Sequence, residues 1–387
     1  MTATRDLSLM IVAGEPSGDA HAAALVQALR IEVPGTNFFG ATGPMLRAAG
    51  VDSIVNTDDL SILGLVEIGR ALPRFWRAFR GLRQAAIERK PQGIILVDWP
   101  DFNLRLARSL HRRGFKIIYY ISPQLWAWRS HRIRNIQRDV DLMLSILPFE
   151  LPWYQQRSVS HVEFVGHPLA GEVQARYGKQ EFCRLNDLDT SRPIISLLPG
   201  SRHKELQRIL PSMLDAVPLI RRKCPDVQFA LALAPGRSPE QARHILAMRN
   251  GGEQTVRIVQ HATREALAAS DVAAIASGTA TLEAALLGTP MVIAYKESAI
   301  NWHILGRLIT ADHFGLVNLI AGERIATELM QNELKGENLA RELLGLLEPQ
   351  RNREARKQLS SIARQLGDSR ASHRAAKRIL AEIDSVG

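Results

Sequence analysis

The sequence predicts an α/β fold with two parallel-sheet domains. Short, continuous apolar runs such as residues 93–97 alternate with helical stretches in both halves of the chain, as expected for strands covered on both faces. Glycine-containing turns follow several of these runs, and such turns are where parallel sheets bind ligands. The pattern breaks once, in a polar stretch at residues 171–192, and then restarts. These observations indicate two Rossmann-like domains that face each other across a cleft.

That break sets the expected domain boundaries. We expect an N-terminal domain at residues 1–170, a linker at 171–192 and a C-terminal domain at 193–345. Residues 346–387 are charged and helical in pattern, and we expect these helices to pack back on the N-terminal domain. A chain of 387 residues is long enough for two such domains.

The composition is that of a soluble protein from a reducing compartment. Hydrophobic residues make up 46% and charged residues 23%. The cysteines, Cys183 and Cys224, form neither a disulfide framework nor a zinc-ligand spacing. The apolar run at 7–13 is wrongly flanked for a signal peptide, and no run reaches the roughly 18 residues of a membrane span. The net charge of +10 points to an anionic partner, which could be nucleotide, nucleic acid or a phospholipid surface.

The first strand is expected at residues 7–13, followed by a turn and a helix that runs to about Arg30. The turn places Glu15, Asp19 and His21 where they could touch a ligand, although it lacks the GxGxxG dinucleotide pattern. For Asp19 we favour the simpler role of capping its own helix. Glu15 is the candidate substrate contact.

Residues 70–90 form a basic helix with aromatic side chains at helical spacing. Such a helix is typical of membrane-surface binding, although a core-facing helix with a solvated basic back fits the same pattern. We favour the membrane surface because tryptophan and phenylalanine lie beside arginine. The residues concerned are Arg74, Phe75, Trp76, Arg77, Phe79 and Arg80.

A strand at 93–97 leads directly into Asp98. Carboxylates at the carboxyl end of a buried strand are where α/β enzymes keep catalytic groups. Asp101 is expected to cap the following helix, whereas Asp98 has no such structural task and is the candidate general base. Asp139 and Asp141 match a DxD metal motif, but a match this short is common by chance.

The second half starts with a strand at 193–198 and a glycine turn that presents Arg202, which is suited to bidentate phosphate contact. Further strands are expected at 227–233 and 256–259, a loop at 314–324 and a helix beginning at Glu328.

Residues 271–294 contain the strongest local signal. A strand is expected to end before Ser277-Gly278-Thr279, and a helix to run over residues 280–287. Unpaired N–H groups at the helix start and the hydroxyls of Ser277 and Thr279 would bind a diphosphate. Glu283, one turn further on, would accept hydrogen bonds from a ribose. An ordinary capped helix in an α/β domain is the alternative.

Taken together, these features suggest group transfer from a nucleotide to a hydroxyl acceptor. A carboxylate in the N-terminal half would deprotonate the acceptor, and the helix start with Arg202 would stabilise the departing diphosphate. No divalent ion or other cofactor is then required.

Segments across nearly the whole chain, each weak alone, resemble the lipid-A-disaccharide synthases, bacterial glycosyltransferases of the two-Rossmann GT-B type. The similar segments are residues 13–19 (AGEPSGD), 64–67 (GLVE), 98–103 (DWPDFN), 121–129 (ISPQLWAWR), 147–150 (LPFE), 165–168 (VGHP), 198–202 (LPGSR) with Glu205, and 277–290.

The resemblance implies inverting transfer of 2,3-diacylglucosamine from its UDP derivative to the 6-hydroxyl of 2,3-diacylglucosamine 1-phosphate. It implies Asp98 as the base. It also implies Ser277-Gly278-Thr279 and Arg202 as diphosphate contacts and Glu283 as the ribose contact. It adds Asn318 and Gln331 as substrate-binding residues, although the family's Pro-Asn reads Val317-Asn318 here. It also implies a cytoplasmic protein held peripherally on the inner face of the inner membrane. The oligomeric state stays open, with a homodimer as one option.

Two other functions fit parts of the sequence. A UDP-sugar 2-epimerase would share the fold without requiring the basic aromatic helix. A nucleic-acid binder would use the positive charge together with Trp126 and Trp128. We expect no nucleic-acid partner, because neither alternative explains all the segments above.

Overall fold

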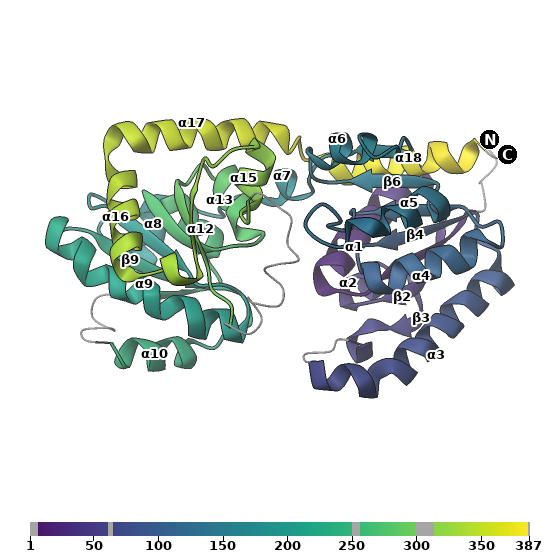
Figure 1. The fold of residues 1–387 in the computed structure, drawn as a ribbon, viewed down its shortest axis with the longest axis horizontal. Helices are drawn as coiled ribbons and strands as arrows, with labels where there is room; N and C mark the ends of the chain where they lie inside the picture. Colours follow the sequence, from purple (N-terminus) through teal and green to yellow (C-terminus); the bar gives the residue numbers. More distant parts are fainter. Residues whose placement is uncertain (1–6, 61–64, 250–255, 299–312, 386–387) are drawn as a thin grey trace. The chain divides into compact units, whose positions relative to one another are not determined.

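The computed structural model of the chain describes residues 7–60, 65–249, 256–298 and 313–385 (Figure 1). It divides into two compact units, one made of Met1–Pro168 with Asp368–Gly387 and the other of Leu169–Gly367. The chain therefore passes from one unit to the other twice. Each unit contains a parallel sheet with helices, which confirms the predicted fold class.

The first unit is built on a seven-stranded sheet in the order β3-β2-β1-β4-β5-β6-β7, and every described pairing in it is parallel. The strands are β1 (Ser8–Ala13), β2 (Asn37–Thr42), β3 (Asp52–Asn56), β4 (Gly93–Val97), β5 (Ile117–Tyr120), β6 (Leu142–Ser145) and β7 (Val162–Phe164). The central strands β1, β4 and β5 are almost entirely buried, which explains their continuous apolar sequence.

Helices pack around this first sheet. They are α1 (Pro16–Glu32), α2 (Pro44–Ala48), α3 (Leu65–Arg89), α4 (Pro100–His111), α5 (Ile133–Asp139), α6 (Glu150–Gln155) and the late α18 (Ala371–Asp384). Helix α18 packs against α1 and β6. Gly93, at the start of β4, leaves room for it, because a Cβ there would lie 3.1 Å from the Ile383 side chain.

The second unit repeats the arrangement with six strands in the order β10-β9-β8-β11-β12-β13. They are β8 (Ile194–Leu198), β9 (Gln228–Leu233), β10 (Arg257–Gln260), β11 (Val272–Ala276), β12 (Met291–Tyr295) and β13 (Thr327–Met330). Its helices are α7 (Leu169–Glu172), α8 (Lys179–Leu185), α9 (His203–Lys223), α10 (Pro239–Ala247), α12 (Thr263–Ala269), α13 (Ala280–Leu286), α15 (Leu316–Ala321), α16 (Gly336–Leu347) and α17 (Pro349–Gln365).

Both sheets change winding direction at an equivalent place. The strand order reverses between β1 and β4 in the first unit and between β8 and β11 in the second. Ligands of open parallel sheets bind outside the carboxyl ends of the strands at such a switch point. Asp98 follows β4, and Ser277 follows β11. Candidate residues from both halves of the sequence therefore lie at switch points.

Residues 171–192 are ordered parts of the second unit, with α8 packed against α12. Arg176 fixes the segment before α8, because its backbone N–H and its Nε both donate to the Glu265 carboxylate, at 3.0 and 2.7 Å. The helices after residue 345 divide between the units: α17 packs against α13, α15 and α16, whereas α18 joins the first unit.

Two local expectations in the second unit were wrong. Residues 314–324 are not a plain loop, because α15 lies within them. Glu328 does not begin a helix but lies in β13, which pairs in parallel with β12 at the edge of the sheet. Pairing and burial of Leu329 outweigh the helical propensity of this short segment. The Gly64 end of the 64–67 motif lies outside the described residues.

No helix within the described ranges is long and apolar enough to cross a membrane.

Candidate functional site

Asp98 lies in a strained turn at the carboxyl end of β4. Asp98 and Trp99 both have positive φ, 48° and 51°, a region that costs non-glycine residues roughly 1–2 kcal/mol each. Two buried side chains hold the turn through the Asp98 carbonyl, which accepts from the Tyr119 hydroxyl at 2.6 Å and from Asn103 Nδ2 at 2.8 Å. Strain maintained by its surroundings is typical of functional sites.

The Asp98 carboxyl has the proton affinity of a general base. Its pKa is raised to about 6, first by burial and then by the charge of Glu15, while a hydrogen bond from the Trp99 backbone acts in the opposite direction. Glu15 is exposed at the N-cap position of α1, and no hydrogen bond to that helix from its side chain is present. The Glu15 charge is thus close enough to Asp98 to raise the pKa of its carboxyl. At neutral pH Asp98 is mostly ionised and still basic enough to accept a proton.

The Trp99 indole joins this turn to the glycine turn after β1. A Cβ on Gly14 would lie 2.0 Å from the indole ring, so only glycine fits beneath it. The other side of the indole belongs to an aromatic cluster: it stacks on Phe102 with centroids 4.1 Å apart and lies 6.0 Å from the ring of Phe75.

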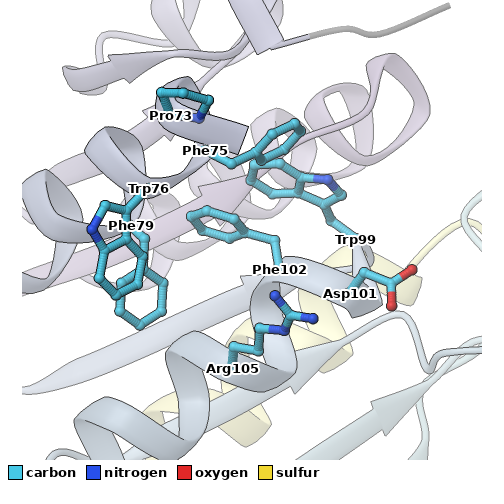
Figure 2. A pocket seen from close by; sticks show the side chains of 8 residues that line it. All are labelled: Pro73, Phe75, Trp76, Phe79, Trp99, Asp101, Phe102 and Arg105. Atoms are coloured by element: carbon cyan, nitrogen blue, oxygen red, sulfur yellow. The ribbon is translucent and has the colours of Figure 1, made fainter. Parts of the chain in front are cut away.

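These aromatic side chains line an open groove of about 870 Å³ between α3 and α4. Figure 2 shows the rings of the two helices turned toward one another, with Asp101 and Arg105 also on the wall. The lining residues are Pro73, Phe75, Trp76, Phe79, Trp99, Asp101, Phe102 and Arg105. Asp101 lies in the first turn of α4 instead of at its cap, and it pairs with Arg129 and Arg132.

Helix α3 has one buried face and one exposed face. Ala78, Leu82 and Ala86 are buried in the core of the first unit. Trp76, by contrast, is 54% exposed and stacks on Phe79, with the Arg80 guanidinium 5.0 Å from its ring. The other two arginines of the predicted membrane surface, Arg74 and Arg77, line a second hollow of about 540 Å³ together with residues of β3.

The second unit contains a separate pocket of about 300 Å³ at its switch point. Five predicted contacts line it together: Arg202, Ser277, Gly278, Thr279 and Glu283. Three further lining elements were not predicted as ligand contacts: Ala234-Pro235 after β9, Thr263 at the start of α12, and Glu205. Strand-end positions are the signal that could have identified the first two.

The turn before α13 exposes backbone donors to this pocket. Gly278 has φ 152°, which only glycine adopts without strain. The hydrogen bonds of the helix begin with the N–H of Thr281, which donates to Gly278 O at 3.1 Å, so the N–H groups of the pocket-lining residues 278–280 come before the first of them. The Ser277 hydroxyl donates to Phe314 O at 2.9 Å. Ser277 therefore anchors the turn instead of offering its proton to a ligand.

Arg202 extends from an equally constrained turn. The Glu205 carboxylate accepts from the backbone N–H groups of Ser201 and Arg202, both at 3.0 Å, and from the Arg202 guanidinium at 3.1 Å. A Cβ on Gly200 (φ 111°) would collide with that carboxylate. Since Glu205 occupies the backbone donors of this turn, the exposed Arg202 side chain is what remains for an anion.

Asn318 and Gln331, also expected to bind substrate, are not among the residues that line this pocket. Asn318 is fully buried, and its amide nitrogen donates to Ala326 O and Glu328 Oε1, both at 2.8 Å. Gln331, with its amide nitrogen facing the Glu297 carbonyl, makes two 3.1 Å hydrogen bonds to the Glu297 backbone. In the structure both side chains therefore bond to other parts of the chain, and their role in substrate binding stays a prediction.

Other acidic residues singled out in the sequence are structural. Asp19 does not cap its own helix: its carboxylate accepts from Gly43 N at 2.8 Å and Met45 N at 2.7 Å, so it caps α2. Asp139 is buried and pairs with Arg138, and Asp141 accepts from Ile117 N at 2.7 Å. No group of three or more His, Cys, Asp or Glu side chains within the described residues could hold a metal ion.

Solved structures show the same fold at low sequence identity. A UDP-GlcNAc 2-epimerase from Neisseria meningitidis, solved with UDP-GlcNAc, has a TM-score of 0.64 at 11% identity and covers 97% of this chain and 99% of that one. The calicheamicin glycosyltransferase CalG4 has a TM-score of 0.62 at 14% identity, covering 99% of this chain and all of that one. Identities this low show the GT-B fold and do not choose between epimerase and transferase.

Sequence comparison distinguishes the transferase from the epimerase. The family model described as lipid-A-disaccharide synthetase matches residues 9–383. The lipid-A-disaccharide synthase of Trichlorobacter lovleyi is 40% identical over 385 residues, covering 99% of this chain and 100% of that protein. The corresponding protein of Solibacter usitatus is 43% identical over 350 residues, covering 90% of each. The chain therefore belongs to the lipid-A-disaccharide synthetase family.

Proposed function

We propose that the chain transfers 2,3-diacylglucosamine from its UDP derivative to the 6-hydroxyl of 2,3-diacylglucosamine 1-phosphate, with inversion at the anomeric carbon. Family membership makes it a glycosyltransferase of lipid A disaccharide synthesis, with a nucleotide-sugar donor and a sugar-phosphate acceptor. One observation carries the assignment of residues: a polar pocket and a raised-pKa carboxylate lie at equivalent switch points of the two units.

The donor half of the reaction belongs to the second unit in this proposal. The diphosphate binds at the N–H groups of the turn that contains Gly278 and Thr279, and Arg202 compensates its charge. Glu283, on the same pocket wall, accepts hydrogen bonds from the ribose hydroxyls. As the bond between the anomeric carbon and the diphosphate oxygen breaks, these donors stabilise the charge that develops on UDP.

Asp98 is the base in the acceptor half. It removes the proton of the acceptor 6-hydroxyl as that oxygen bonds to the anomeric carbon, and burial together with the charge of Glu15 keeps the pKa of Asp98 high enough for the transfer. The aromatic groove between α3 and α4 begins at Trp99, the next residue along the chain. We assign it to an acyl chain, because burial of each CH₂ contributes about 0.8 kcal/mol.

The same groove supports peripheral attachment to the inner face of the inner membrane. Trp76 is exposed beside it, and the exposed arginines Arg74, Arg77 and Arg80 belong to the same helix. Arginine attracts anionic headgroups, and tryptophan favours the membrane–water interface. An enzyme with two acylated substrates gains from this arrangement because neither lipid has to leave the bilayer completely.

The direct test is an assay with the purified full-length chain, UDP-2,3-diacylglucosamine and 2,3-diacylglucosamine 1-phosphate. Mass spectrometry should find the disaccharide 1-phosphate and one UDP per product. Incubation with UDP-GlcNAc alone is the companion experiment. Epimerised sugar in that incubation, without disaccharide in the first, would replace the transferase by an epimerase.

A further inference from the structure

Glu283 can serve a ribose only if its carboxylate is held in one orientation, and a neighbouring arginine provides that restraint. Arg264 Nε donates to Glu283 Oε1 at 3.0 Å. The pair is partly buried, with 33% of the Arg264 side chain and 19% of the Glu283 side chain exposed. It joins α12 to α13, the two short helices that follow β10 and β11.

The guanidinium is itself fixed at its far end. Arg264 Nη1 donates to the backbone carbonyl of Glu172 at 2.7 Å. Glu172 ends α7, which packs against α13. Its own carboxyl lies close enough to respond to both partners: partial burial raises the Glu172 pKa, the Arg264 charge lowers it and the Glu283 charge raises it.

This geometry leaves one side of the Glu283 carboxylate for a ligand. Oε1 is taken by Arg264, while no hydrogen bond from the described part of the chain reaches Oε2. Both Glu283 and Thr263, the residue before Arg264, line the 300 Å³ pocket. A carboxylate that has one oxygen anchored and belongs to a pocket-lining residue is suited to bind hydroxyl groups at a defined position.

We infer that Arg264 is a positioning residue for nucleotide recognition: it orients Glu283 so that the enzyme distinguishes a ribonucleotide from a 2′-deoxyribonucleotide. The inference rests on the proposed placement of the UDP ribose at Glu283. A simpler role, in which the ion pair only joins α12 to α13, predicts a loss of stability without a change in this selectivity.

The test measures the dissociation constants of UDP and 2′-deoxy-UDP by calorimetric titration of the full-length chain. The wild-type protein should bind UDP about tenfold more tightly than 2′-deoxy-UDP, because one hydrogen bond to a charged group contributes about that factor. Arg264→Ala should weaken UDP binding and bring the ratio of the 2′-deoxy-UDP dissociation constant to the UDP dissociation constant close to one. Glu283→Gln should do the same. Arg264→Lys should restore this ratio in part. Lysine can reach Glu283, but its single ammonium group cannot also donate to the Glu172 carbonyl as the planar guanidinium does.

A matched control removes an ion pair of the same unit away from the pocket. Arg184 pairs with Glu181 on α8 at 2.6 Å, and Arg184→Ala should leave the ratio unchanged. Equal weakening of both nucleotides in the Arg264 variants, with the wild-type ratio retained, would overturn the inference. If Arg264→Ala fails to fold, Arg264→Lys and Glu283→Gln decide the question. A wild-type protein that binds no UDP would instead overturn the proposed function.

Discussion

The proposed donor pocket of the second unit and the aromatic groove of the first belong to units with similar sheets, but they are built in opposite ways. The pocket of the second unit, about 300 Å³, is made largely of backbone turns and small polar residues. The groove of the first unit, about 870 Å³, is made of aromatic side chains from α3 and α4. Topology sets where ligands of such sheets generally bind, whereas the lining residues set the kind of ligand, and in the proposed function the polar pocket binds the nucleotide and the aromatic groove an acyl chain.

The largest effect should come from a change that affects the first unit alone. Asp98→Asn keeps the shape of the turn but cannot accept the acceptor proton, so turnover should fall about a thousandfold. UDP affinity should stay within about twofold, since the donor pocket lies in the other unit. Steady-state kinetics and UDP titration check the two parts. Near-normal turnover would remove Asp98 from the mechanism.

Arg202→Ala is the corresponding change in the second unit. Loss of the guanidinium should lower kcat/KM for the donor about a hundredfold, because it removes charge stabilisation of the departing diphosphate. UDP binding should weaken, whereas the pH dependence set by Asp98 should persist. Donor kinetics and pH profiles of the variant test this, and a shifted acid limb would show that the two units are not chemically separate.

The pH profile itself tests the electrostatics of the first unit. Because the pKa of Asp98 is raised to about 6, the base is lost as the pH falls through that value, and kcat/KM should decline below about pH 6. Glu15→Gln removes a negative charge nearby and should move this limb to lower pH. An unchanged limb in Glu15→Gln would mean that burial alone sets the pKa.

A smaller effect is expected at the surface beside the groove. Replacing Arg74, Arg77 and Arg80 by serine should weaken partition onto vesicles that contain anionic lipid, by about 1 kcal/mol per arginine. UDP binding should not change. Flotation with anionic and with neutral vesicles separates charge from apolar contact. Equal partition of the variant and the wild type onto the anionic vesicles would leave the helix as core packing alone.

The smallest expected effect concerns the stability of the first unit and involves neither the pocket nor the groove. Asp19→Ala leaves the N–H groups of Gly43 and Met45 at the start of α2 without their acceptor, and should lower the free energy of unfolding by about 1–2 kcal/mol. Urea denaturation measures it. Asp19→Asn retains one oxygen acceptor and should lose less.

The sequence predicts the second unit's site better than the first unit's. The Ser277-Gly278-Thr279 turn and Arg202 follow from local rules for strand ends and helix starts. Asp98 could be found because a carboxylate after a buried strand is conspicuous. The support of that turn by Tyr119 and Asn103 could not, since it depends on pairing between strands distant in sequence. The capping of α2 by Asp19 was missed for the same reason: local propensity names a capping residue but not the helix it reaches.

The position of α18 has a consequence for how the protein is made. The first unit begins with the first residues of the chain and is completed by α18, so all of Leu169–Gly367 is synthesised in between. Ala375, Ala376, Ile379 and Ile383 of α18 are buried, and the surface they cover stays open until α18 has been synthesised. The second unit can thus finish folding on the ribosome while the first is incomplete. The unit that bears the proposed base is therefore completed after the second unit, and its incomplete core is exposed to chaperones and proteases during that interval.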